Sequence, residues 1–269
     1  MRYIALEEAF SIPELENRHP SPWQGFRFSQ RHIADWARKL PDFTEYRLPE
    51  MDAAGIDVPK AAAGELERAV RELGFCGALV NDHFQGHYLD EPRYDEVWAA
   101  LEELSVPLYL HPGAPPADHW KVLDGRPELY GATWSWAAET GGHALRIIYG
   151  GVFDRHPGAT LILGHMGEFL PFMRSRLDSR YLTLDLDAPL RRMPSAYIGS
   201  NVVITTSGVF SPAALTGAVL EIGADAVLFS VDYPYESSHQ AVAGLERTTL
   251  SDSDRHKIAH GNAERILRL

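Results

Sequence analysis

The chain has 269 residues, of which 45% are hydrophobic, and a formal net charge of -12 at pH 7. This length and apolar content predict a single α/β domain, residues 1–269, with a sizeable core. The acidic balance argues against nucleic acid or an anionic membrane as a partner. No stretch approaches the roughly 18 consecutive apolar residues of a membrane span. Cys76 is the single cysteine, which excludes a disulfide within the chain and predicts a cytoplasmic protein.

Apolar runs that end in polar residues alternate with helical patterns along the chain. Strands are expected at 3–10, 77–80, 106–111, 160–165, 202–207 and 226–232. Helices are expected at 61–73, 92–104, 136–149, 168–181, 212–222, 238–247 and 254–267. Repeated alternation of this kind implies parallel strands, and at this length it predicts a (β/α)8 TIM barrel.

The six expected strands are two fewer than a closed barrel needs. A strand begins at Ile56 and is cut off between Val58 and Pro59, where a helix follows at once. Because parallel neighbours need a crossover of a dozen or more residues, we expect a strand–helix–strand segment to be missing at this point.

Three metal-type side chains, Glu7, His111 and Asp232, are expected near the carboxyl ends of strands. Parallel strands end at one edge of a sheet, and imidazole with carboxylates is a typical ligand set for a divalent cation. Each residue also has an ordinary explanation: a solvated charge, a hydrogen-bonded core histidine and a helix cap. Their recurrence at one end of the sheet favours a shared metal site.

His165 and Glu168 have the spacing of a carboxylate–imidazole pair across a strand–helix turn. Alternatively, Glu168 only favours the helix N-terminus electrostatically. Arg174 and Arg176 lie on the following helix, and one of them is a candidate for binding a substrate carboxylate, although such arginines commonly form surface or interface ion pairs. The histidines at 83, 87, 119 and 143 show no pairing in the sequence.

Aromatic residues gather in the loops beyond the expected strand ends, where they suit a flat apolar ring or serve ordinary packing. The candidates for substrate contact are Trp23, Phe26, Trp136 and Tyr233. The chain has neither a Gly-rich phosphate loop nor a Gly-x-Ser-x-Gly elbow, so kinase and serine-hydrolase activities are not supported.

Eight segments resemble the amidohydrolase-related decarboxylases, a group that includes aminocarboxymuconate semialdehyde decarboxylase. They are LEEAF (6–10), GALVND (77–82), YLHP (109–112), GVFDRHP (151–157), ILGHMGE (162–168), ITTSG (204–208), FSVDYPYE (229–236) and GNAER (261–265). Within that group the chain most resembles the ortho-hydroxybenzoate decarboxylases. The family has a strand–helix–strand unit where Val58 meets Pro59 here.

The resemblance implies metal ligands at Glu7, His111 and Asp232, with His165 and Glu168 beside them and Arg176 facing the substrate. Many relatives have a second ligand histidine where this chain has Ala9. Zn, Mn and Mg are all compatible with the three remaining ligands. The resemblance also implies a homodimer or homotetramer.

The expected reaction is a metal-dependent, non-oxidative and reversible decarboxylation by a carbon–carbon lyase. The substrate would be an ortho-hydroxybenzoate of the 2,3-dihydroxybenzoate, γ-resorcylate or salicylate type. Asp232 would protonate the ring carbon, assisted by His165 and Glu168. Two alternatives stay open: a metal-dependent hydrolase or hydratase on the same barrel, and a non-catalytic binding protein, which Ala9 and the missing segment would favour.

Overall fold

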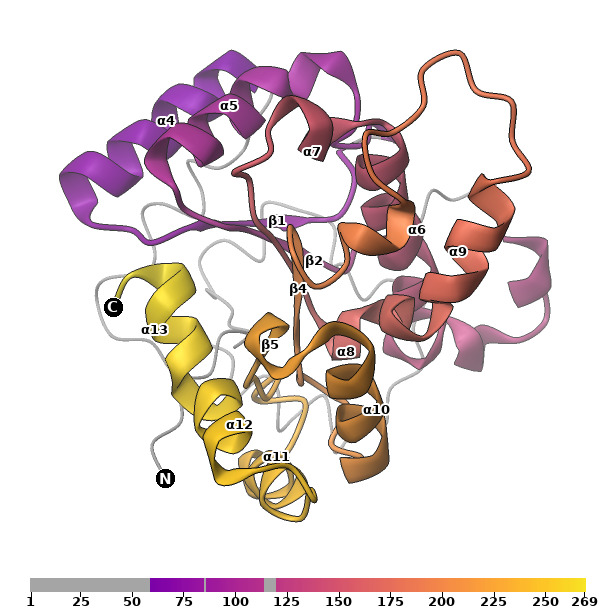
Figure 1. Ribbon diagram of the computed structural model, residues 1–269, viewed down its shortest axis with the longest axis vertical. Helices are drawn as coiled ribbons and strands as arrows, with labels where there is room; N and C mark the ends of the chain where they lie inside the picture. The colour runs from indigo at the N-terminus through magenta and orange to yellow at the C-terminus, as the bar shows by residue number, and fades with distance from the viewer. Residues whose placement is uncertain (1–58, 85, 114–119) are drawn as a thin grey trace.

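The computed structural model describes residues 59–84, 86–113 and 120–269 of the chain. In this part a five-stranded parallel sheet lies at the centre, and its strand order follows the chain (Figure 1). The strands are β1 (Ala78–Asn81), β2 (Leu108–His111), β3 (Leu161–Leu163), β4 (Val202–Thr205) and β5 (Val227–Leu228). Since all five run in the same direction, their carboxyl ends meet at one edge.

Helices connect and cover the strands, as strand–helix alternation predicts. They are α4 (Pro59–Leu73), α5 (Asp95–Leu104), α6 (Ser135–Tyr149), α7 (Val152–Arg155), α8 (His165–Glu168), α9 (Arg174–Tyr181), α10 (Pro212–Ile222), α11 (Ser238–Glu246), α12 (Asp252–His256) and α13 (Asn262–Leu267). Local sequence explains the start of α10, where Pro212 occupies the first turn and the Ser211 hydroxyl accepts a hydrogen bond from the Ala214 N–H. No helix of the described residues is both long enough and apolar enough to cross a membrane.

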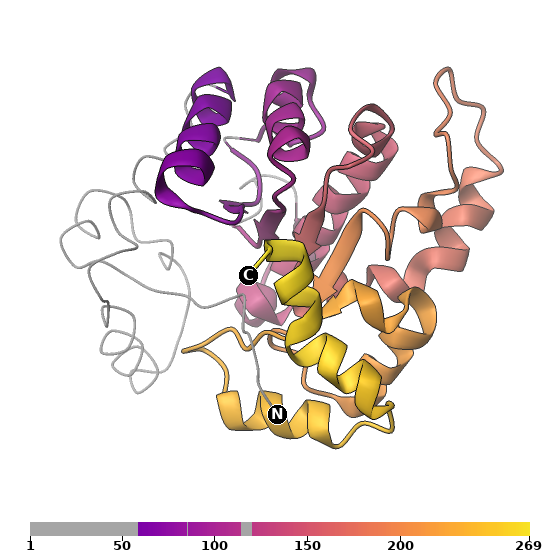
Figure 2. The same cartoon turned by 60° about the vertical axis from the view of Figure 1, so that its left-hand side comes forward.

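The two faces of the sheet bury different sets of side chains, because neighbouring residues of a strand point in opposite directions. Leu110 and Leu163 pack with Trp98 of α5 and Ile147 of α6 in the largest core cluster. The alternate strand residues pack instead against α13, which Figure 2 shows beside the strands and away from α5 and α6. Cover on both faces explains why the strands are almost continuously apolar.

Five of the six expected strands are present, and the sixth, at 3–10, lies outside the described residues. The proposed missing segment also lies at that boundary, because α4 begins at Pro59 and the residues before it are not described.

Two expectations about element boundaries were wrong. The strand expected at 226–232 pairs only over Val227–Leu228, because the Phe229 N–H donates to the carbonyl of Ile258 and leaves the ladder. The helix expected at 168–181 begins only at Arg174. The segment labelled α8 (His165–Glu168), whose residues have positive φ angles and form a turn instead of a regular α-helix, and the 3₁₀ turn η5 (Leu170–Met173) lie before it.

Candidate active site at the carboxyl end of the sheet

A left-handed turn follows β3 in place of the expected start of a helix. Five successive residues, His165 to Phe169, have φ angles of +46°, +59°, +71°, +47° and +65°. The left-handed region costs an L-residue roughly 1–2 kcal/mol, and glycine is the exception. Gly167 is the one glycine of the five, and a Cβ there would lie 2.6 Å from Cγ2 of Ile204. The turn is therefore an energetically costly conformation that the surrounding packing must hold in place.

The left-handed turn brings His165 and Glu168 together. His165 Nδ1 lies 2.7 Å from Glu168 Oε1, and the side chains are 22% and 1% exposed, respectively. Met166 lies between them in the chain and is buried in the core around β4 and α10. The Nδ1–H donates to the carboxylate, which fixes the tautomer of the imidazole. The pairing expected from the sequence is present, and we call these two residues the His165 pair.

Asp232 follows β5, at the same edge of the sheet as the end of β3. Its carboxylate faces Nε2, the second ring nitrogen of His165. Its Oδ2 is 3.7 Å from His165 Nε2. Asp232 has a φ of +74°, and its carbonyl accepts hydrogen bonds from the N–H groups of Tyr235 and Glu236 at 3.0 and 3.1 Å. The chain reversal after β5 therefore directs this carboxylate toward the His165 pair.

Negative charge accumulates around Asp232. Burial, followed by the charge of Asp232, raises the pKa of Tyr235 to about 12. The same two causes, in the same order, raise the pKa of the Glu236 carboxyl, while His165 opposes the shift. Burial disfavours any charge, whereas the contribution of Asp232 disfavours only a further anion, so it is this second cause that suits a cation.

His111 ends β2, the strand next to β3. Its Nδ1 lies 2.9 Å from the carbonyl oxygen of Pro112, which fixes the tautomer with the lone pair on Nε2, the form that binds metals. This donor chemistry and the charge around Asp232 both fit a divalent cation. The part of the chain that the structure describes holds no cluster of three or more metal-binding side chains, and the expected third ligand, Glu7, lies outside that part.

The candidate substrate-contact residues lie in different settings. Arg176 is exposed on α9, Trp136 is half-buried in the first turn of α6, and Tyr233 is 41% exposed next to Asp232. Trp23 and Phe26 lie outside the described residues. The contacts of these five residues with a substrate stay predictions.

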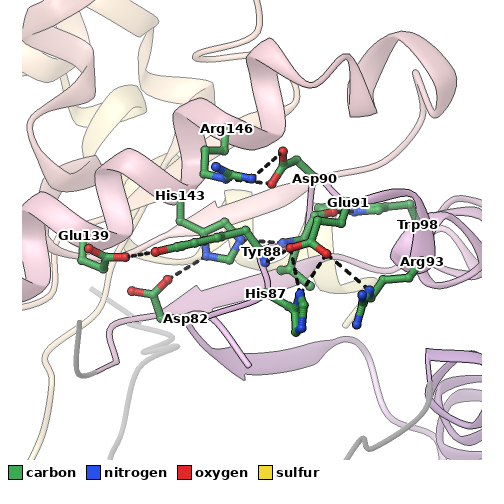
Figure 3. Close-up of polar contacts among 11 residues, drawn as sticks. Asp82, His87, Tyr88, Asp90, Glu91, Arg93, Trp98, Glu139, His143 and Arg146 are labelled. Atoms are coloured by element: carbon green, nitrogen blue, oxygen red, sulfur yellow. Dashed lines mark hydrogen bonds and ion pairs between the residues drawn. The ribbon is translucent and has the colours of Figure 1, made fainter. Parts of the chain in front are cut away.

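A second carboxylate–imidazole pair, which the sequence did not reveal, joins Asp82, directly after β1, to His143 on α6 (Figure 3). His143 Nδ1 lies 2.7 Å from Asp82 Oδ1, and both side chains are fully buried. The Thr140 hydroxyl donates to Asp82 Oδ2 at 3.2 Å, and the Leu89 N–H donates to His143 Nε2 at 2.9 Å. We call Asp82 and His143 the His143 pair. Its members are 61 residues apart, so no local spacing could have indicated it.

Tyr88 and Glu139 extend this network (Figure 3). The Tyr88 hydroxyl donates to the Glu139 carboxylate, and its ring meets the edge of the His143 ring with centroids 4.9 Å apart. Burial first, and then the hydrogen bond to Glu139, raise the pKa of the Tyr88 hydroxyl well above its ordinary value.

These features define an α/β protein of the barrel class that places polar side chains at the carboxyl ends of parallel strands. A family model described as Amidohydrolase matches residues 28–269. The γ-resorcylate decarboxylase of Rhizobium sp. (strain MTP-10005) is 42% identical over 245 residues, which cover 88% of this chain and 74% of the relative. The chain belongs to the amidohydrolase family, so the resemblance found in the sequence is confirmed.

Solved structures give the same result. A crystal structure of 2,6-dihydroxybenzoate decarboxylase complexed with 2,6-dihydroxybenzoate matches with a TM-score of 0.84 and 35% identity, over 99% of this chain and 98% of that one. The dihydroxybenzoic acid decarboxylase from Polaromonas sp. JS666, with bound manganese and the inhibitor 2-nitroresorcinol, matches with a TM-score of 0.86 and 33% identity, over 100% and 97%. The expected TIM-barrel fold of the amidohydrolase type is thereby confirmed.

Proposed function

We propose that the chain is a carboxy-lyase that performs the metal-dependent, non-oxidative decarboxylation of an ortho-hydroxybenzoate of the γ-resorcylate, 2,3-dihydroxybenzoate or salicylate type. The observation that carries this proposal is that His165 lies between two carboxylates at one edge of the sheet. Its Nδ1 is 2.7 Å from Glu168 Oε1, and its Nε2 is 3.7 Å from Asp232 Oδ2. The similarity to γ-resorcylate decarboxylases supports the choice of reaction and of substrate class.

We assign one divalent cation to Glu7, His111 and Asp232. When bound, the cation would supply positive charge that stabilises the negative charge of the substrate. Manganese is the metal bound in the Polaromonas relative, which favours it here, with zinc and magnesium as the other candidates. Ala9 stands where many relatives have another ligand histidine, so coordination by this chain would leave open positions for substrate.

The reaction needs one proton delivered to carbon. His165 either accepts the proton of the ortho-hydroxyl group or stabilises the negative charge of the resulting phenolate oxygen. Glu168 supports this role because its carboxylate stabilises a positively charged imidazole. Asp232, which takes up a proton from water before each turnover, then delivers this proton to the ring carbon that bears the carboxylate and becomes an ionised carboxylate again. Aromaticity is lost at this step. It returns when the bond between that carbon and the carboxylate breaks, its electron pair enters the ring and CO2 leaves.

Arg176 would bind the substrate carboxylate, and Trp23, Phe26, Trp136 and Tyr233 would enclose the ring. We further propose that the protein is cytoplasmic and assembles as a homodimer or homotetramer. Large apolar side chains exposed on η5 and directly after α9 support the assembly; they are Phe172, Met173, Leu182 and Leu184.

The test is to strip the protein of metal, to reload it separately with Mn²⁺, Zn²⁺ and Mg²⁺, and to supply a panel of hydroxybenzoates. Release of CO2 with an equimolar phenolic product would support the proposal. A product with water added would identify a hydrolase or hydratase instead. Bound metal below one equivalent, with no turnover of any substrate, would favour the non-catalytic binding protein.

A further inference from the structure

The end of β4 holds His165 from two sides. Ser207 is fully buried, and its Oγ accepts a hydrogen bond of 3.0 Å from the backbone N–H of His165. That N–H belongs to the first residue of the left-handed turn. A polar group buried at this position is costly to leave without a partner, so the bond favours the conformation that carries His165.

The Ser207 hydroxyl is itself held by a chain of buried hydroxyl groups. Ser207 Oγ lies 2.9 Å from Thr205 Oγ1, which lies 3.2 Å from the hydroxyl of Tyr109. Tyr109 precedes the proposed metal ligand His111 by two positions in β2, so both side chains emerge on the same face of the sheet. The hydroxyl chain therefore connects the strand of His111 with the turn of His165.

Gly208 approaches the imidazole ring itself. Its φ is +64°, and a Cβ built on it would lie 3.3 Å from Cδ2 of His165. Its N–H donates to the carbonyl of Val231 at 3.3 Å, next to Asp232. The backbone of Gly208 thus contacts both the ring of His165 and the segment that carries Asp232, and a Cβ there would press against the ring.

We propose that Ser207 and Gly208 are positioning residues that set the distance and angle of His165 relative to Asp232, and that the Thr205 and Tyr109 hydroxyls support Ser207 in this role. The inference rests on the proposed function, in which His165 and Asp232 carry the chemistry. Neither positioning residue exchanges a proton with the substrate: Ser207 acts through the backbone and Gly208 through the space it leaves.

The first experiment removes the hydroxyls one at a time as Ser207→Ala, Thr205→Val and Tyr109→Phe. We expect kcat to fall roughly 10- to 100-fold in Ser207→Ala, since a small misplacement of a reacting group has costs of this size. Thr205→Val should have a smaller effect and Tyr109→Phe the smallest, while KM changes less than about threefold in all three variants.

The second experiment adds a methyl group beside the ring as Gly208→Ala. Its control is Gly74→Ala, because Gly74 has a φ of +79° and a Cβ there would meet nothing within 4 Å. Both variants force alanine into the left-handed region, so both should lose stability. Only Gly208→Ala should lower kcat and shift the pH profile of kcat, because only its new methyl group contacts His165.

A spectroscopic measurement separates this inference from the proposed reaction. The Nδ1 proton of His165, assigned by its disappearance in His165→Asn, should move in the NMR spectrum of Ser207→Ala and Gly208→Ala and stay in place in Gly74→Ala. If the wild-type protein decarboxylates nothing but these shifts occur, the proposed function fails and the positioning role stands. Unchanged shifts in Ser207→Ala, or an unchanged kcat in an active enzyme, would overturn the positioning role.

Discussion

The His165 pair and the His143 pair have the same carboxylate–imidazole distance of 2.7 Å and opposite surroundings. Both nitrogens of His143 are hydrogen-bonded within the core: Nδ1 donates to Asp82, and Nε2 accepts from the Leu89 N–H. In the His165 pair, Nε2 faces the carboxylate of Asp232 at 3.7 Å, and the side chain is partly exposed.

This difference teaches that a carboxylate beside a histidine is not in itself a catalytic feature. Nε2 of His143 already accepts the Leu89 N–H, and an N–H at this position would find no acceptor there, so this nitrogen is not available for proton transfer. Protonation of His165 would place an N–H toward a carboxylate. The second nitrogen therefore decides which pair can take part in proton transfer, and the following predictions test that distinction.

The largest effect should come from Asp232→Asn. The amide keeps the size of the side chain but cannot deliver a proton, so kcat should fall roughly 10³-fold while the fold is retained. CO2 release and circular dichroism would measure the two quantities. A rate near that of the wild type would remove Asp232 from the proposed mechanism.

His143→Ala should act on stability instead of turnover. It leaves the buried Asp82 carboxylate and the Leu89 N–H without their imidazole partner, which should cost about 3 kcal/mol of unfolding free energy. Urea denaturation would measure the loss, and kcat per folded molecule should change less than twofold. A large loss of kcat without a loss of stability would contradict the distinction between the pairs.

Glu168→Gln should lower kcat roughly 30-fold at nearly constant KM. The amide oxygen can still accept the hydrogen bond from His165, so the ring keeps its place, but the negative charge that stabilises a protonated imidazole is lost. The matched variant in the other pair, Asp82→Asn, should leave kcat unchanged. Equal effects of the two variants on kcat would mean that the pairs do not differ in function.

The smallest effect concerns the Tyr88 hydroxyl. Its pKa is raised in the folded protein, so the folded state keeps this proton as pH rises above 10.0 while the unfolded state loses it. The contribution of the hydroxyl to stability is therefore complete below pH 10.0 and is lost as pH rises through the folded pKa. Tyr88→Phe should cost about 1 kcal/mol at pH 8, and the difference from the wild type should shrink above pH 10.0. Urea denaturation at pH 8 and pH 11 would show whether it does.

The sequence predicted the features that depend on local pattern. Leu161–Leu163 and Val202–Thr205 are continuously apolar up to their polar ends because they are buried on both faces, and this pattern located the strands. The three-residue spacing of His165 and Glu168 indicated their contact, because residues that close in the chain need only one turn to meet.

Other features depend on information that local pattern does not hold. Apolar periodicity does not specify the sign of φ, so Glu168 and Phe169, which end the left-handed turn, were mistaken for the start of a helix. The contact of Asp82 with His143 requires that β1 and α6 are already packed together. The proposed role of Gly208 depends on the imidazole ring of His165, which follows β3, whereas Gly208 follows β4. The sequence gives both segments but not their contact.

Strand order gives the sheet a direction of growth. Each strand from β2 to β5 pairs with the described strand that precedes it in the chain, so no pairing within this part must wait for a segment made much later. Because the chain is synthesised from its N-terminus, each emerging strand and its helix can pair with the free edge of the sheet already formed. His165 leaves the ribosome before Ser207 and Asp232, so its costly backbone conformation acquires its support only when the last two strands of this sheet have arrived.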